Sequence, residues 1–160
     1  MRSGLTDHRC DDGQGRDIRL VEQVPTLADY RRLRDAVGWG NGDAEAQATA
    51  LGHALFSVCL IAGDDVIGCG RVVGDGGQYY YVQDIIVLPP HQGQGLGRRI
   101  MGAIMAYLAA HARPGAFVAL MAAHGVAPFY ERYGFVIRPL DRPGMWYTVP
   151  YRATGGPSAR

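Results

Sequence analysis

The sequence predicts one α/β domain of the α+β kind, built on a mixed sheet. Between residues 17 and 150, strand-like and helix-like patterns follow each other in the order β-α-α-β-β-β-α-β-α-β-β. Residues 78–123 read as strand, helix and strand, a crossover that joins two parallel strands of one sheet. The chain has 160 residues, which is long enough to build one hydrophobic core and short for two separate domains.

The first half supplies one strand, two helices and a strand pair. "DIRLVEQV" (17–24) alternates as a strand does. The helix in 26–38 has Thr26 as its N-cap, Asp29 in the capping-box position and Gly38 as its stop. A second helix begins at Asp43. Strands are then expected at 56–62 and 66–75, around a turn at 63–65.

The second half contains the crossover and the closing elements. Residues 78–88 are too apolar and too long for an edge strand, so we expect a central one. The helix at 95–111 has an apolar face formed by Leu96, Ile100, Met101, Ile104, Met105 and Leu108. Further elements are expected in this order: a strand at 116–123, a short helix at 126–134, and strands at 135–140 and 145–151.

Composition narrows the class of protein. The hydrophobic share of 48% and charged share of 19% are those of a soluble globular chain. A net charge of +1 gives no basic face, so no nucleic acid partner is expected. No apolar run reaches membrane-spanning length, and the N-terminus lacks the apolar core of a signal peptide. Cys59 and Cys69 lie in apolar runs, which predicts buried reduced thiols and a cytoplasmic protein.

A glycine-rich turn, "HQGQGLGRRI" (91–100), enters the long helix. Glycines at 93, 95 and 97 let backbone N–H groups converge at a helix N-terminus, where an anion is stabilised. This favours a phosphate or pyrophosphate site. A Walker loop would need a following Gly-Lys-Ser/Thr, and a dinucleotide-binding fold would need its glycines after the first strand. Neither pattern is present.

The segment "DIIVLPPHQGQGLGRRI" resembles the signature of the GCN5-related N-acetyltransferases (the GNAT superfamily), with Gln92-x-x-Gly95-x-Gly97 opening a helix. "FVALMAAHGVAPFYERYGFVIRP" resembles the family's second block, which ends in Tyr-x-x-x-Gly-Phe, here Tyr130 to Phe135. The resemblance covers residues 17–150, which we take as the domain, with a disordered tail at 1–16 and a flexible tail at 151–160. It implies a mostly antiparallel sheet with a splayed central parallel pair and about four helices.

The resemblance implies acetyl-CoA as cosubstrate and no metal. The pyrophosphate of acetyl-CoA would bind the turn, mostly through backbone N–H groups, at Gln92, Gly93, Gln94, Gly95, Leu96, Gly97 and Arg98. Arg99 is interpreted instead as part of the helix surface. The pantetheine arm would pair with the free edge of the splayed strand, through the backbone of Ile85, Ile86 and Val87.

The implied reaction is attack by an amine on a thioester, with Tyr130 as proton donor to the departing thiolate. The alkylammonium, with a pKa near 10.4, must first lose a proton. Asp84 and His124 are both candidates for the general base, whereas Gln83 cannot accept a proton. Strand alternation would point Asp84 away from Gln83. The asparagine that many family members carry seven residues before the tyrosine is Ala123 here.

Tyr81, Gln83 and Trp39 are the candidate acceptor-site residues. The block "GMWY", together with "QDIIVLPPHQGQGLG", resembles the aralkylamine (serotonin-type) N-acetyltransferases, and this resemblance implies a small primary amine as acceptor. A protein or peptide amine, and a non-catalytic acetyl-CoA-binding module, remain alternatives. The apolar runs at 135–140 and 145–151 predict strands that would otherwise leave an exposed edge. In the family that the chain resembles, such strands often pair or swap across a two-fold axis, which implies a homodimer.

Overall fold

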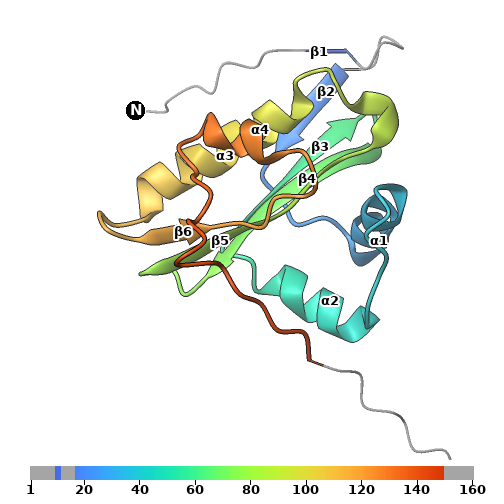
Figure 1. The fold of residues 1–160 in the computed structure, drawn as a ribbon. Helices are drawn as coiled ribbons and strands as arrows, with labels where there is room; N and C mark the ends of the chain where they lie inside the picture. Colours follow the sequence, from blue (N-terminus) through green and yellow to red (C-terminus); the bar gives the residue numbers. More distant parts are fainter. Residues whose placement is uncertain (1–9, 12–16, 150–160) are drawn as a thin grey trace, which may run out of the picture. The chain divides into compact units, whose positions relative to one another are not determined.

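The computed structural model describes residues 10–11 and 17–149 (Figure 1). The chain forms two compact units, one ending at Met121 and the other beginning at Ala122. The tails expected at 1–16 and 151–160 lie outside the described residues, except that Cys10 and Asp11 pair with the strand that follows them.

The N-terminal unit contains a six-stranded sheet in the order β1 to β6. Its strands are β1 (Cys10–Asp11), β2 (Asp17–Val21), β3 (Phe56–Ala62), β4 (Asp65–Gly74), β5 (Tyr79–Val87) and β6 (Phe117–Ala119). Neighbouring strands are antiparallel except β5 and β6, which are parallel. The expected mixed sheet with one parallel pair is therefore confirmed, and β5 is an inner strand as its length and apolarity predicted.

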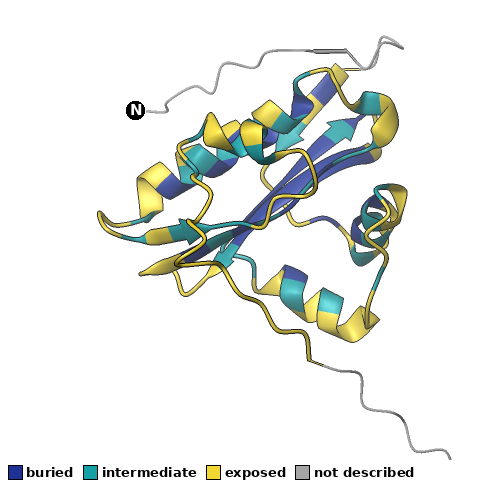
Figure 2. Cartoon of the chain, in the orientation of Figure 1, coloured by how far each residue is buried: buried dark blue, intermediate teal, exposed yellow. Residues whose placement is uncertain are grey.

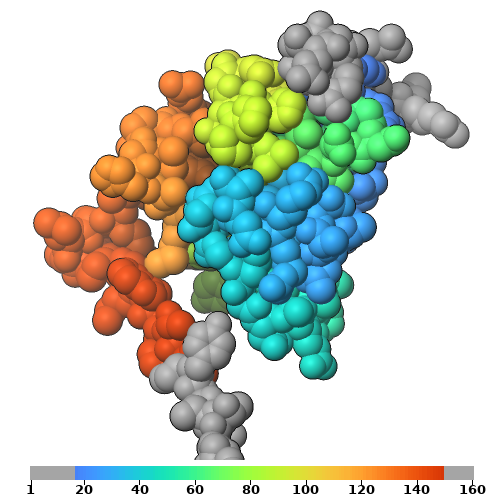
Figure 3. All heavy atoms as spheres, turned by 90° about the vertical axis from the view of Figure 1, so that its right-hand side faces the viewer, coloured from blue at the N-terminus to red at the C-terminus, as the bar shows by residue number. Residues whose placement is uncertain are grey.

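Helices cover both faces of this sheet. They are α1 (Leu27–Ala36), α2 (Ala44–Gly52) and α3 (Leu96–His111), with a 3-10 helix η1 (Pro89–His91) before α3. Figure 1 shows α3 on one face and α1 on the other, and Figure 3 shows α1 and α2 side by side, in blue to cyan. The predicted caps are present, since Thr26 Oγ accepts from Asp29 N and Asp43 Oδ1 from Ala46 N. No helix among the described residues is long and apolar enough to cross a membrane.

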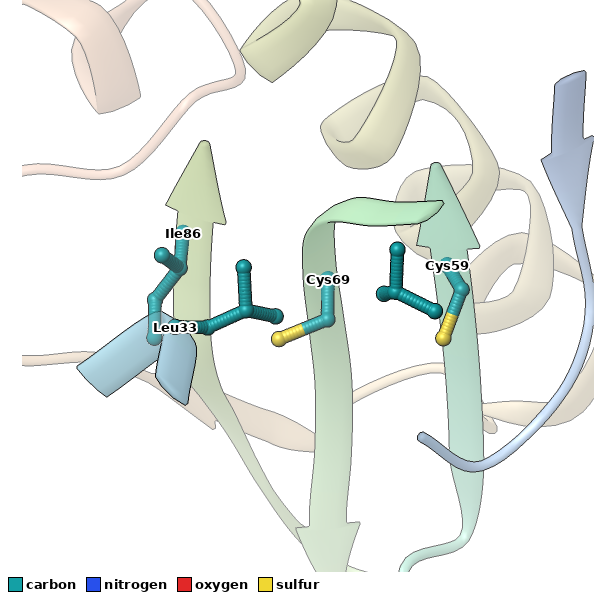
Figure 4. Close-up of a cluster of buried hydrophobic side chains, with 5 residues drawn as sticks. Leu33, Cys59, Cys69 and Ile86 are labelled. Carbon is teal, nitrogen blue, oxygen red and sulfur yellow. The ribbon is translucent and has the colours of Figure 1, made fainter. Parts of the chain in front are cut away.

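Apolar side chains are buried on both faces of the sheet, where its strands appear in dark blue in Figure 2. The expected apolar face of α3 is confirmed, with Met105 partly buried and the other members buried. Beneath α1 lies a cluster made of Leu33, Cys59, Val66, Cys69 and Ile86 (Figure 4). Cys59 and Cys69 are both buried free thiols, as the sequence predicted.

The parallel pair β5–β6 separates soon after it begins. Pairing joins only Tyr79, Tyr80 and Tyr81 to the three residues of β6, whereas β5 continues to Val87. The strand predicted at 116–123 is therefore too long, because its ladder partner leaves after Ala119. The separation agrees with the splay that the family resemblance implied, and it leaves the second half of β5 with one unpaired edge in the described sheet.

The C-terminal unit contains one short helix, α4 (Ala127–Glu131), within the range predicted for it. The strands predicted at 135–140 and 145–151 are wrong over the described residues, since no strand forms in 135–149. Apolar content suggested strands there, but a strand also needs a hydrogen-bonding neighbour. Pro139 and Pro143 further interrupt this segment, because proline cannot donate to a ladder.

Candidate active site

The strand β5 carries a β-bulge at Asp84. Arg71 of β4 lies opposite Gln83, and Cys69 lies opposite Ile86, so two residues of β5 face one glycine of β4. Asp84 has a φ of 55°, a left-handed conformation that aspartate tolerates better than most side chains. The strand therefore changes its alternation at this residue.

The bulge overturns the expected orientation of Asp84. Gln83 shares a sheet face with Arg71, because directly opposed residues of an antiparallel pair lie on the same side. Asp84 contacts the Arg71 side chain on that same face. Gln83 and Asp84 therefore point to one side, where simple alternation had placed them on opposite sides. Tyr81, opposite Val73, lies on this face as well.

The Asp84 carboxylate is fully buried and accepts hydrogen bonds from three side chains. Oδ2 accepts from the Tyr30 hydroxyl at 3.0 Å and from Arg71 Nε at 2.6 Å. Oδ1 accepts from Arg34 Nη1 at 3.1 Å. Burial and then the Asp84 charge raise the pKa of Tyr30, so its hydroxyl keeps its proton and donates.

Sequence reasoning named Asp84 but missed its three partners. Arg71 was the available signal, because an arginine inside the apolar run "VIGCGRVVG" must find a carboxylate or carbonyl if that strand is buried. Arg71 in fact meets Asp84 and the Ala50 carbonyl. Arg34 and Tyr30 lie one turn apart on α1, which brings both to the same carboxylate.

Trp39 belongs to the surroundings of this network. The Arg34 guanidinium lies 5.6 Å from the Tyr30 ring centroid and 5.7 Å from that of Trp39. The Trp39 side chain is exposed. Phe56, another aromatic residue of the first half, stacks on Tyr107 of α3 and so belongs to the opposite face of the sheet.

The glycine turn has the conformation that its sequence predicted. Gly93 and Gly95 have φ values of 78° and 79°. Gly95 is the N-cap of α3, and no side chain caps this helix end. A Cβ atom on Gly95 would lie 3.3 Å from Arg98 Nη2, so the Arg98 guanidinium lies beside the helix N-terminus. A cation and the first-turn N–H groups of α3 are thus in place for an anion.

The unpaired edge of β5 leads directly into this turn. Leu88 N donates to Ile67 O, and the Ile86 carbonyl also points towards β4. By alternation, the backbone groups of Ile85 and Val87 point to the unpaired edge, whereas those of Ile86 do not. Gln92 Nε2 donates to the Val87 carbonyl at 2.9 Å and so ties the turn to the strand end.

The other residues of the turn have more local roles. The Gln94 side chain reaches the Pro90 carbonyl at 3.5 Å, within the turn itself. Leu96 is buried as the first residue of α3, with Gly97 following it in the helix. Arg99 donates to the Ile18 carbonyl and thereby fastens α3 to β2, consistent with a structural role.

Tyr130 lies on α4 in the C-terminal unit and is half-buried. Its ring packs edge-on against Phe129 and Phe135, at centroid distances of 5.0 and 6.2 Å. Burial raises the pKa of Tyr130, which keeps the hydroxyl protonated at neutral pH. Tyr133 also packs on Phe129. His124 is exposed in the loop before α4, as is Ala123.

Comparisons with known proteins identify the family. The family model described as acetyltransferase (GNAT) domain matches residues 53–137. The N-acetyltransferase ycf52 of Pyropia yezoensis, described as uncharacterized, is 28% identical over 89% of this chain and 84% of its own length.

Solved structures agree. A probable acetyltransferase of Staphylococcus aureus, SA2161, superposes with a TM-score of 0.78 at 36% identity, covering 82% of this chain and 99% of that one. The GNAT family protein SP0256 of Streptococcus pneumoniae gives a TM-score of 0.67 at 35% identity, covering 84% and 99%. The glycine turn, the separated parallel strands and these matches together show that the chain belongs to the GNAT family of N-acetyltransferases.

Proposed function

We propose that this chain transfers the acetyl group of acetyl-CoA to a small primary amine, and that the turn at 92–98 binds the pyrophosphate. The supporting observation is the N-terminus of α3, where Gly93 and Gly95 are left-handed and no side chain occupies the helix end. A side-chain cap would compete for the N–H groups that an anion needs. Arg98 adds a positive charge beside them.

The pantetheine arm would lie along the unpaired edge of β5. Ile85 and Val87 direct their backbone groups to that edge, so they are the proposed partners of its amides. Ile86 would support them through its side chain, which belongs to the cluster beneath α1. Since the Val87 carbonyl accepts from Gln92, its N–H group is the more available of the two.

In the proposed reaction the amine nitrogen attacks the thioester carbonyl carbon, the C–S bond breaks, and the sulfur leaves as a thiolate. Tyr130 donates a proton to that thiolate, a role supported by its place on α4 and by a hydroxyl that keeps its proton at neutral pH. The attacking nitrogen loses one further proton as the amide forms, and solvent returns a proton to the Tyr130 oxygen. The ammonium proton must leave before the attack. We propose His124 or a water molecule as its acceptor, because the Asp84 oxygens already bind three donors.

Trp39, Tyr81 and Gln83 are the proposed acceptor contacts. Gln83 and Tyr81 lie on the sheet face that α1 covers, and Trp39 reaches the same network through Arg34. The exposed indole of Trp39 suits an apolar or aromatic amine through stacking. A polyamine is less suited, because the Asp84 carboxylate on this face is already paired with two guanidinium groups.

A thiol-release assay with acetyl-CoA tests this proposal against its alternatives. The panel contains an aralkylamine, a polyamine, a peptide with a free N-terminus, and buffer alone. Release with the aralkylamine above the other wells supports the proposed acceptor class. Release only with the peptide would move the acceptor to protein amines. Binding of acetyl-CoA without release above the buffer well for any amine would indicate a non-catalytic module.

We also propose a cytoplasmic homodimer. Large apolar side chains of the segment 136–149 are exposed in the single chain: Val136, Ile137, Leu140, Met145, Trp146, Tyr147 and Val149. Exposed apolar side chains in such number favour an interface. A dimer mass by light scattering at micromolar concentration supports this proposal, and a monomer mass contradicts it. Two buried cysteines without a disulfide, Cys59 and Cys69, are typical of proteins in a reducing compartment such as the cytoplasm.

A further inference from the structure

We propose that Asp84 is a positioning residue: with Tyr30, Arg34 and Arg71 it holds the bulge of β5 in the shape that presents the unpaired edge to acetyl-CoA. This inference rests on the proposed function, and it assigns Asp84 a role other than that of general base. Tyr30 and Arg34 belong to α1 and Arg71 to β4, so three side chains from two elements fix one residue.

The backbone at Asp84 needs such support. A φ of 55° is unfavourable for any residue with a Cβ atom, although aspartate and asparagine tolerate it best. A buried carboxylate is also costly unless it is paired and hydrogen-bonded. The three donors supply the hydrogen bonds that the buried carboxylate needs. By holding the Asp84 side chain in place, they also stabilise its left-handed backbone. Strained backbone that is held by its surroundings in this way is typical of functional sites.

The bulge determines which residues face the unpaired edge. Ile85 follows Asp84 directly, and alternation counted back from Leu88 directs its backbone groups to that edge. Without the extra residue, the pairing of β4 and β5 would shift by one residue beyond this point. Such a shift would turn the backbone groups of Ile85 and Val87 away from the edge. The bulge is therefore needed for the alignment of the strand with the turn at 92–98.

The same contacts argue against proton transfer at Asp84. Both carboxylate oxygens accept hydrogen bonds, and the side chain has no exposed surface. Two guanidinium groups pair with the one carboxylate, so a substrate ammonium would have to displace an arginine to reach an Asp84 oxygen. A general base needs a free oxygen within reach of the proton it removes.

Three substitutions of Asp84 separate the two roles. Asp84→Asn keeps an acceptor oxygen and tolerates the left-handed backbone, Asp84→Gly adopts that backbone freely, and Asp84→Ala does neither. For a positioning residue, CoA affinity measured by calorimetry falls in the order Asn, Gly, Ala, with Ala weaker than wild type by roughly tenfold. The kcat of Asp84→Asn stays within about tenfold of wild type. Loss of a general base would instead lower kcat by about a hundredfold or more in all three variants, at unchanged CoA affinity.

Arg34 and Arg32 give a matched pair on α1. Arg34 donates to Asp84, whereas Arg32 donates to the Val66 carbonyl and to Asp29. Arg34→Met should weaken CoA binding and raise the KM for acetyl-CoA, while Arg32→Met should leave both unchanged. Tyr30→Phe, which removes one donor and keeps the ring, should act like Arg34→Met with a smaller effect. Each variant is measured well below its own unfolding temperature, so that stability alone does not change the result.

The outcomes are distinct. If wild-type protein does not bind CoA, the proposed function fails and the variants are not needed. If wild type binds CoA but Asp84→Ala, Asp84→Gly and Arg34→Met bind it equally well, the positioning role is wrong. Equal collapse of kcat in the three Asp84 variants would make Asp84 the base. A lower unfolding temperature with unchanged affinity and KM would make the network a purely structural one.

Discussion

Replacing Gly95 by alanine tests the pyrophosphate site at a single position. Gly95 has a φ of 79°, and a residue with a Cβ atom is less stable there by about 1–2 kcal/mol. The new Cβ would lie 3.3 Å from Arg98 Nη2, the end of a flexible side chain that can move away. The backbone is thus the main source of the cost. If the turn relaxes to avoid it, CoA affinity should fall by roughly 5- to 30-fold.

Gly102→Ala is the matched control within the same helix. Gly102 is exposed, and a Cβ there would meet nothing within 4 Å. Because alanine favours a helix interior, this variant should gain roughly 0.5–1 kcal/mol of stability and bind CoA as wild type does. Calorimetric titration with CoA measures the affinity, and scanning calorimetry verifies the fold. If the turn instead keeps its conformation, the strain lowers the unfolding temperature and leaves the affinity unchanged. Unchanged affinity in a Gly95→Ala protein whose unfolding temperature is also unchanged would refute a pyrophosphate site at this turn.

Three further predictions concern the rest of the chain. Tyr130→Phe should lower kcat by about a hundredfold to ten-thousandfold at nearly unchanged CoA affinity, while Tyr133→Phe should cost far less; full kcat in the first variant would exclude the donor role. Thr26→Ala removes the N-cap of α1 and should reduce the free energy of unfolding, measured by urea titration, by about 1 kcal/mol. An unchanged free energy of unfolding would show that the cap does not stabilise the protein. Burial raises the pKa of the Cys59 thiol to about 11 and that of Cys69 further still. Both should therefore resist alkylation at pH 8 in the native protein and react after denaturation, and prompt native labelling would contradict their burial.

The regular elements of the N-terminal unit could be predicted because local chemistry determines them. Thr26 and Asp43 specify helix starts through their own side chains. The apolar residues of α3 repeat at helical spacing and become buried on one face. The conformation of the glycine turn follows from residues that accept a positive φ.

Other features depend on partners far away in the sequence. The bulge at Asp84 forms where β5 meets Arg71 of β4 and two side chains of α1. One of these, Arg34, lies 50 residues before Asp84 in the sequence. The pattern of residues 79–87 gives no sign of it, so simple alternation misplaced Asp84. In the C-terminal unit, apolar runs at 135–140 and 145–151 suggested strands. An apolar run indicates that a segment could be buried, but it does not show whether a neighbouring strand is present to form hydrogen bonds with it.

The most direct test of the central claim is a product analysis with wild-type protein, acetyl-CoA and the best amine of the panel. Acetyl transfer to the amine yields free CoA and N-acetylated amine in equal amounts, both dependent on the enzyme and both lost when the amine is left out. Free CoA without acetylated amine would mean that water accepts the acetyl group. Neither product, in a protein that binds acetyl-CoA, would contradict the assignment of acetyl transfer.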